Sequence, residues 1–139
     1  ETISIRILAA MARNSEIGIV RSLILRVASD EAIHWRMGWV LLENLWKSAA
    51  ETEKAGLLEV LEERLHEAQA RFIRRGAGTR SGAKKRSGTP SHPFGALDVQ
   101  QRTQIVSDSM KDIAERLVGI GIAHPAFDSY LSSDPPGAA

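Results

Sequence analysis

The sequence predicts an all-α protein. Apolar residues recur at intervals of three and four over four long segments, as they do on the buried face of a helix. No segment shows the strict alternation of apolar and polar residues that is typical of a half-buried strand. The chain has 139 residues, 43% of them hydrophobic and 25% charged, which is enough for a globular domain with a modest core.

Composition excludes several classes of site. The chain has no cysteine, so disulfides, thiolate zinc sites, iron–sulfur clusters and cysteine nucleophiles are ruled out. A net charge of +1 gives no overall field that would attract nucleic acid. No stretch approaches the roughly 18 apolar residues of a membrane span, and no signal-peptide pattern opens the chain. We therefore expect a cytoplasmic protein with no membrane partner.

The first half of the chain is predicted to form a helical hairpin. Residues 1–13 have helical periodicity, and Asn14 or Ser15 can then cap a second helix with Glu16 in its first turn. The second helix is predicted over residues 15–49. Its apolar seam steps by three and four through Val20, Ile24, Val27, Leu41 or Leu42, and Leu45.

Two further helices follow, separated by a loop. A third helix is predicted over residues 52–75, with its apolar seam at Leu58, Leu61, Leu65, Ala68 and Phe72. Residues 76–96 are rich in Gly, Ser, Pro and basic residues and are predicted to form a flexible loop. A fourth helix is predicted over residues 97–120, with buried positions at Val99, Ile105, Val106, Ile113 and Leu117.

The chain therefore divides into helices over residues 1–75, a basic loop over 76–96, and a C-terminal helix with a tail over 97–139. Gly119 and Gly121 weaken the end of the fourth helix, and the tail that follows is predicted to be irregular.

The seam of the second helix contains two ionisable residues. Glu31 and His34 follow Val27 at steps of four and three, so both point in the same direction as the apolar residues. A buried carboxylate costs several kcal/mol unless something compensates its charge. A metal ion would do so, because carboxylate oxygen and neutral imidazole are both good ligands for iron. An inward-facing Glu-x-x-His is the ligand pair of di-iron helical bundles.

Glu1 supplies a third candidate ligand. It lies in the seam of the first helix, and it is 14 residues from Ser15, whereas Glu31 is 16 residues beyond that turn. At about 1.5 Å per residue the two arms are ~21 and ~24 Å long. An antiparallel hairpin would thus place Glu1 beside Glu31 and His34.

These residues also carry a resemblance to a known group. The segments ETISIRILAA and ASDEAIHWRMGW resemble the second half of the ferritin-like superfamily, which includes ferritins, rubrerythrins and di-iron oxygenases and oxidases. In that pattern a lone Glu, matched here by Glu1, is followed about thirty residues later by D-E-x-x-H, matched by Asp30, Glu31 and His34. The segment from Trp35 to Trp39 is similar to bacterial ferritin-like proteins. The resemblance covers residues 1–46.

The resemblance implies a ferritin-like bundle in which this chain supplies a metal-binding hairpin and two further helices. It implies two irons per complete site, with Glu31 bridging and Glu1 terminal, and manganese would suit the same ligands. A complete site needs two ligand sets, and this chain shows one. We expect the other half of the bundle to precede Glu1 in the intact protein, or alternatively to come from a second subunit.

Other readings of these residues remain open. Glu31 and His34 could form a hydrogen-bonded pair without metal, and Glu1 could be solvated. A second Glu-x-x-His at Glu63 and His66 falls off the seam of the third helix and is predicted to be a solvated face.

The remaining candidates are interpreted structurally. His92 and His124 each adjoin a proline and are expected at the surface, and Trp35, Trp39 and Trp46 are expected to be packing residues. The basic run over residues 71–86 lacks interleaved aromatics, so a solvated loop is favoured over a nucleic-acid interface.

Three functions follow from the sequence. The leading hypothesis is a non-haem di-iron oxidoreductase that activates dioxygen toward an unidentified small-molecule substrate. The second is an iron-binding ferroxidase or storage protein that uses the same ligands. The third is a metal-free helical interaction module.

Overall fold

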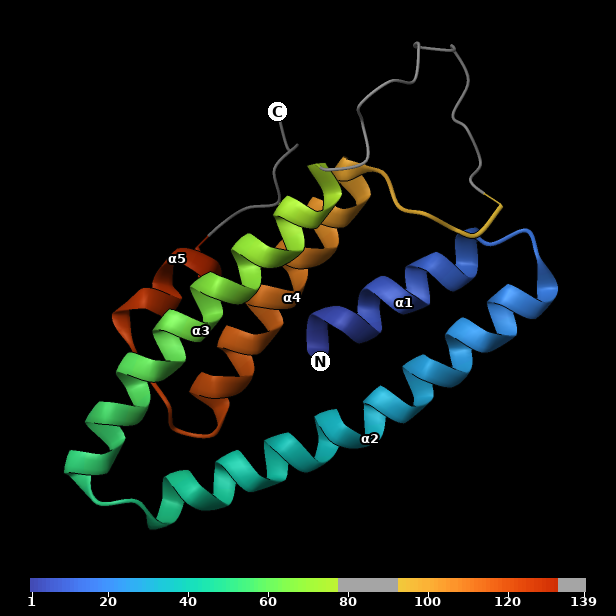
Figure 1. The fold of residues 1–139 in the computed structure, drawn as a ribbon. Helices are drawn as coiled ribbons and strands as arrows, with labels where there is room; N and C mark the ends of the chain where they lie inside the picture. The colour runs from blue at the N-terminus through green and yellow to red at the C-terminus, as the bar shows by residue number, and fades with distance from the viewer. Residues whose placement is uncertain (78–92, 133–139) are drawn as a thin grey trace.

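A computed structural model describes residues 1–77 and 93–132 of the chain (Figure 1). It confirms the all-α class, because the described residues contain no strand and only one isolated bridge, between Ser15 and Phe94. The helices are α1 (Thr2–Asn14), α2 (Gly18–Ser48), α3 (Glu51–Ala77), α4 (Val99–Gly119), the 3₁₀ turn η1 (Pro125–Phe127) and α5 (Asp128–Leu131). Most of the predicted basic loop lies outside the described residues.

The helices form two antiparallel pairs. α1 runs back along α2, and α3 runs back along α4 (Figure 1). The two pairs are joined because α1 also packs against α4. α4 in turn contacts α5, so it lies at the centre of the arrangement.

The core is built around one face of α4. Val106, Met110, Ala114 and Leu117 follow the helical spacing of three and four and are all at most 1% exposed. The buried residues that pack against this face come from α1, α3, the end of α4 and the C-terminal turn: Ile3, Ile7, Leu65, Ile122, Phe127 and Tyr130. The predicted seam of α3 is confirmed, because Leu58, Leu61, Ala68 and Phe72 pack against the same cluster.

The turn between α1 and α2 differs from the prediction. α2 begins at Gly18 rather than residue 15, and its N-cap, Ile17, makes no side-chain cap. Ser15 does not cap because its hydroxyl lies 3.2 Å from the carbonyl oxygen of Pro93 and 3.3 Å from that of Ile17. Arg21 Nη2 donates to the Ser15 carbonyl oxygen at 2.7 Å. The turn is therefore bound to the segment that precedes α4.

Gly95 allows this segment to lie against α1. Its φ is +77°, a conformation that residues with a side chain rarely adopt. A Cβ at this position would lie 2.0 Å from the Met11 carbonyl oxygen and 2.9 Å from the Ser15 nitrogen. Only glycine permits so close an approach of two backbones.

The C-terminal tail was wrongly predicted to be irregular. η1 and α5 occupy residues 125–131, and Phe127 and Tyr130 of these elements are buried in the core at 1% and 9% exposure. Two aromatic side chains spaced by three residues provide enough apolar surface to hold this short segment on the bundle. His124 is half-buried rather than at the surface, and its Nδ1 accepts a hydrogen bond from the Ala126 backbone nitrogen.

The start of α4 differs from the prediction in the exposure of its first residue. Val99, predicted to be buried, is 41% exposed because it lies in the first turn of α4. Asp98 caps this helix: its carboxylate accepts from the Gln101 nitrogen at 2.7 Å, and the Gln101 side chain accepts from the Asp98 nitrogen at 3.2 Å. This reciprocal arrangement is a capping box.

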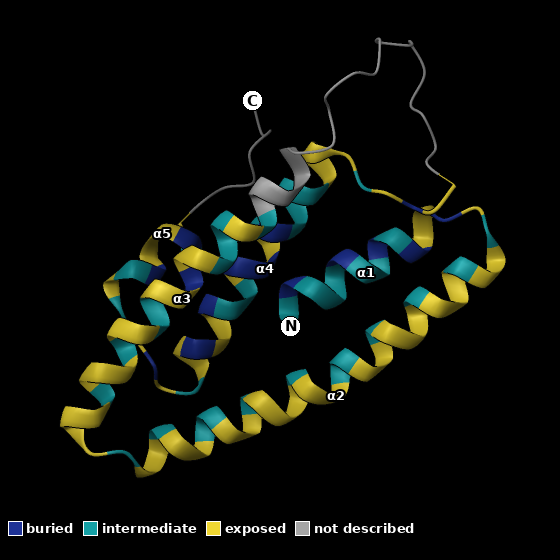
Figure 2. Ribbon diagram, viewed as in Figure 1, coloured by how far each residue is buried: buried dark blue, intermediate teal, exposed yellow. Residues whose placement is uncertain are grey.

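The apolar seam predicted for α2 is only partly covered: Val20, Ile24 and Leu42 are half-buried, whereas Val27, Leu41 and Leu45 are exposed. No residue of α2 is fully buried, and Figure 2 shows the helix as exposed or intermediate along its length. Val27 and Leu41 are 48% and 60% exposed, because no described helix covers this side of α2. Its exposed apolar residues at three- and four-residue spacing, here named the outer stripe, are Ile19, Leu23, Val27, Met37, Leu41 and Leu45. None of the described helices combines the length and apolarity that crossing a membrane requires.

Candidate metal centre

Glu1, Glu31 and His34 lie together in the structure. One donor atom of each, a carboxylate oxygen or an imidazole nitrogen, falls within 4.8 Å of the other two. Glu1 immediately precedes α1, and Glu31 and His34 are one turn apart on α2. The antiparallel pairing of α1 and α2 thus produces the proximity expected from the two arm lengths.

The position of Glu1 leaves its carboxylate free for this cluster. Glu1 is the N-cap residue of α1, but its side chain makes no capping hydrogen bond. Asp30, the other acid of the motif, is turned toward Arg26, with which it forms an ion pair at 3.6 Å. The cluster is therefore made of two carboxylates and one imidazole.

The donor set and its spacing suit a transition metal. Carboxylate oxygens and imidazole nitrogens bind iron, manganese and zinc, and metal–ligand bonds to such atoms are about 2.0–2.2 Å long. Two donors on one ion therefore lie no more than about 4.3 Å apart. The observed 4.8 Å limit is close to this value, so small side-chain rotations would bring all three donors onto one ion.

The cluster is more exposed than the sequence indicated. Glu31 is half-buried, whereas Glu1 and His34 are exposed. Burial therefore does not force compensation of these charges, because no described helix covers the face of α2 that carries them. Among the described hydrogen bonds none joins Glu31 to His34, so the cluster is not held together by a direct Glu–His bond.

The cluster lies at the outer stripe. At about 100° per residue, His34 falls within the outer stripe, and Glu31 falls between the stripe and the three tryptophans of α2. The stripe continues above and below the cluster along the whole helix, from Ile19 to Leu45. A helix packed on this stripe would also cover His34.

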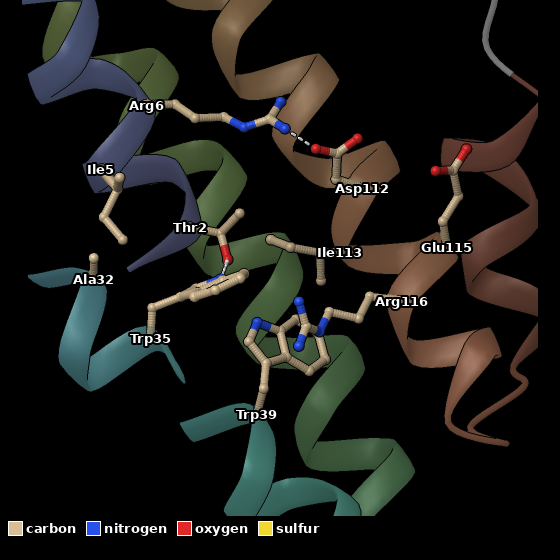
Figure 3. Close-up of a pocket in the computed structure, with 10 residues that line it drawn as sticks. All are labelled: Thr2, Ile5, Arg6, Ala32, Trp35, Trp39, Asp112, Ile113, Glu115 and Arg116. Atoms are coloured by element: carbon tan, nitrogen blue, oxygen red, sulfur yellow. Dashed lines mark hydrogen bonds and ion pairs between the residues drawn. The ribbon is translucent and has the colours of Figure 1, made fainter. Parts of the chain in front are cut away.

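A cavity opens on the tryptophan side of the cluster. It has a volume of about 550 Å³ and lies between α1, α2 and α4, as Figure 3 shows. A smaller cavity of about 220 Å³ includes Glu1 and shares Thr2, Trp35, Trp39 and Ile113 with the larger one. The two cavities therefore extend from the candidate ligand Glu1 to α4.

Trp35 and Trp39 organise this cavity. The Trp35 indole nitrogen donates to the Thr2 hydroxyl at 2.9 Å, which fixes α2 to the start of α1. The Arg116 guanidinium lies 4.7 Å from the centroid of each tryptophan ring, close enough for cation–π attraction to both. Both tryptophans are half-buried and line the cavity, and Trp39 packs against the core cluster, as predicted.

The charges around the cavity are mostly neutralised. Arg6 is ion-paired with Asp112 across the opening (Figure 3). Glu43 lies one helical turn beyond Trp39. A hydrogen bond from Lys47 and the positive charge of Lys47 hold the pKa of the Glu43 carboxyl below its usual value, and the charge of Arg116 has a smaller effect in the same direction.

In the core, burial raises the pKa of Tyr130, and the nearby Glu62 carboxylate adds to this shift.

The other histidines of the sequence do not join the candidate centre. Glu63 and His66 are both exposed on α3, as predicted, and belong to no group of three potential ligands in the described part of the chain. His124 Nδ1 lies 3.8 Å from a carboxylate oxygen of Glu62 and accepts a hydrogen bond from the Ala126 backbone nitrogen at 3.3 Å. His92 lies outside the described residues.

Fold and cluster together define an all-α protein with a candidate carboxylate–histidine metal centre on a helical hairpin. Comparisons of the chain with protein-family models, with curated proteins and with solved structures gave no match. The resemblance of residues 1–46 to the ferritin-like superfamily accordingly stays a prediction.

Proposed function

We propose that this chain supplies one ligand set of a non-haem di-iron centre in a ferritin-like bundle and acts as a dioxygen-dependent oxidoreductase. The observation that carries the proposal is the convergence of Glu1, Glu31 and His34, three residues from two helices, at one level of a hairpin. Carboxylates from two helices and a Glu-x-x-His on one of them are the elements of such a set.

Each residue has a distinct part in this proposal. Glu31 would bridge two ions and Glu1 would bind one terminally, while His34 adds a neutral nitrogen donor. Both carboxylates are accessible enough to change their mode of binding as the charge on the metal changes. Iron supplies the oxidation chemistry when bound, and manganese would suit the same donors. The protein orients the ligands and holds the substrate in the neighbouring cavity.

The second ligand set comes from outside the described residues. A di-iron bundle uses four helices, and α1 and α2 provide two of them. The outer stripe is an apolar face on which two further helices could pack, and it includes the edge of the cluster. A preceding segment of the same polypeptide and a second subunit are the two sources to be distinguished.

Metal content tests the proposal. Protein reconstituted with ferrous iron should hold about two irons per complete four-helix unit by elemental analysis. Glu31→Ala and His34→Ala should both lose this iron. Glu63→Ala and His66→Ala remove the other Glu-x-x-His, which is exposed on α3, and should leave the iron content unchanged. Wild-type protein without iron after reconstitution would overturn both the oxidoreductase and the storage readings.

Molecular mass in solution identifies the source of the second set. Two irons in a dimer of this chain would assign it to a second copy, whereas two irons in a monomeric longer polypeptide would assign it to a preceding segment. Leu41→Glu places a charge on the outer stripe and should weaken whichever helix packing is present.

The cavity favours an oxidoreductase over iron storage. A ferroxidase would use the same three ligands but needs no site for an organic molecule. The volume of about 550 Å³ next to the cluster is within the range of small-molecule sites, roughly 300–1,000 Å³. The metal-free interaction module remains the outcome if no metal binds.

A further inference from the structure

We infer that the cavity between α1, α2 and α4 binds a small organic molecule with one carboxylate on an apolar body, and that Arg116 receives the carboxylate. The role of this molecule as a substrate rests on the proposed function. Its binding does not rest on that function, because neither Arg116 nor any other residue that lines the larger cavity is a candidate metal ligand.

Arg116 is the cation of the cavity that no described carboxylate pairs with directly, although its charge acts at longer range on Glu43. Its guanidinium carbon lies over the rings of both Trp35 and Trp39, 4.7 Å from each centroid, and among the described residues it takes part in no ion pair and donates no hydrogen bond to protein. Stacking engages the faces of a guanidinium and leaves the N–H groups on its edge available, in a fork that matches a carboxylate. The rings thus hold Arg116 in place without using its donors.

The other charges of the cavity select a monoanion. Arg6 is already paired with Asp112, so it offers no second positive charge. Glu115 adds a negative charge to the lining, and in Figure 3 its carboxylate projects away from the two tryptophans. Two arginines and two acids sum to zero, so a bound monoanion leaves a net charge of −1 in the cavity, whereas a phosphate dianion leaves −2 and meets the stronger repulsion from the two acids. A single carboxylate needs only the guanidinium of Arg116.

The remaining lining is apolar. Ile5 of α1 and Ile113 of α4 come from helices other than the one that carries the tryptophans, and Ala32 lies beside Trp35 on α2 (Figure 3). Aromatic and aliphatic walls with one well-placed charged group are typical of sites for drug-sized ligands. The smaller cavity continues from these walls to Glu1, so the apolar end of such a ligand could extend toward the candidate metal centre.

Binding of 4-phenylbutanoate to the chelator-treated, metal-free chain tests this inference. Isothermal titration calorimetry should show that it binds at least about tenfold more tightly than the neutral 4-phenylbutanamide, since a charge-assisted pair to Arg116 is lost in the amide. Arg116→Gln should reduce the carboxylate affinity by a similar factor, and Arg116→Lys should recover part of it. Arg64→Gln, an exposed arginine on α3 paired with Glu67, is the matched control and should have no effect.

The indole N–H resonances locate the ligand. Those of Trp35 and Trp39 should shift on titration, whereas that of Trp46, which donates to the Gly121 carbonyl oxygen outside the cavity, should not. Equal affinity for acid and amide, unchanged affinity in Arg116→Gln, or absence of binding would each overturn the inference. Because the protein carries no metal in this experiment, its result is independent of the iron content measured above.

Discussion

Replacing Gly95 by alanine should destabilise the protein through the turn that sets the α1–α2 hairpin. Two effects add. Holding an alanine at a φ of +77° costs about 1–2 kcal/mol. The new Cβ would also lie 2.0 Å from the Met11 carbonyl oxygen, and relieving such overpacking costs about 1–3 kcal/mol. The expected loss in the free energy of unfolding is therefore about 2–5 kcal/mol.

Gly56→Ala provides the matched control. Gly56 lies inside α3, and a Cβ there would meet nothing within 4 Å. The same substitution should therefore stabilise the protein by about 0.5–1 kcal/mol, because alanine is the better helix former. Urea unfolding followed by far-UV circular dichroism measures both changes. A Gly95→Ala protein within about 0.5 kcal/mol of wild type would show that residues 93–95 do not lie against the end of α1.

Three further predictions concern the core and its helices. Asp98→Ala removes the capping box of α4 and should cost about 1 kcal/mol in urea unfolding, with no change in the fold. Leu117→Ala should lower the free energy of unfolding by about 2–5 kcal/mol, because this side chain is 1% exposed. Leu57→Ala, at 41% exposure, should lower it far less. Equal losses in the two variants would contradict the placement of the core. The pKa of Tyr130 in the folded protein is raised above its ordinary value of 10.0, so as pH rises this phenol ionises in the unfolded chain before it does so in the folded protein. The free energy of unfolding of the wild type should therefore fall as pH rises beyond about 10. Tyr130→Phe should show a smaller fall over the same range.

The helices and the proximity of the three candidate ligands could be predicted because both depend on local regularities. Helical periodicity indicates where a helix runs, as the seam of α3 shows, and an antiparallel hairpin fixes which residue of one arm lies beside which residue of the other. The prediction that Glu1 lies beside Glu31 required only the length of each arm of the hairpin. Whether they bind metal depends on the second ligand set, and that role stays a prediction.

The features that were not predicted depend on contacts between distant segments. Arg116 is more than 75 residues away from Trp35 and Trp39 along the chain, and periodicity does not indicate which helix faces which. The same limit applies to α2: a stripe of apolar residues indicates a face suited to packing but not the presence of a neighbour. Ser15 was misassigned as a helix cap because its actual partner, Pro93, is 78 residues away.

The contact between Gly95 and α1 has a mechanical consequence for the ligand cluster. The turn at residues 15–17 acts as the pivot of two long arms, and Glu1 lies at the far end of the shorter one, about 20 Å away. A rigid rotation of about 5° at the pivot would displace the Glu1 carboxylate by about 2 Å, the length of a metal–ligand bond. The backbone contact at the turn end of the hairpin therefore determines how accurately the donor atoms of the ligand cluster are positioned at the opposite end.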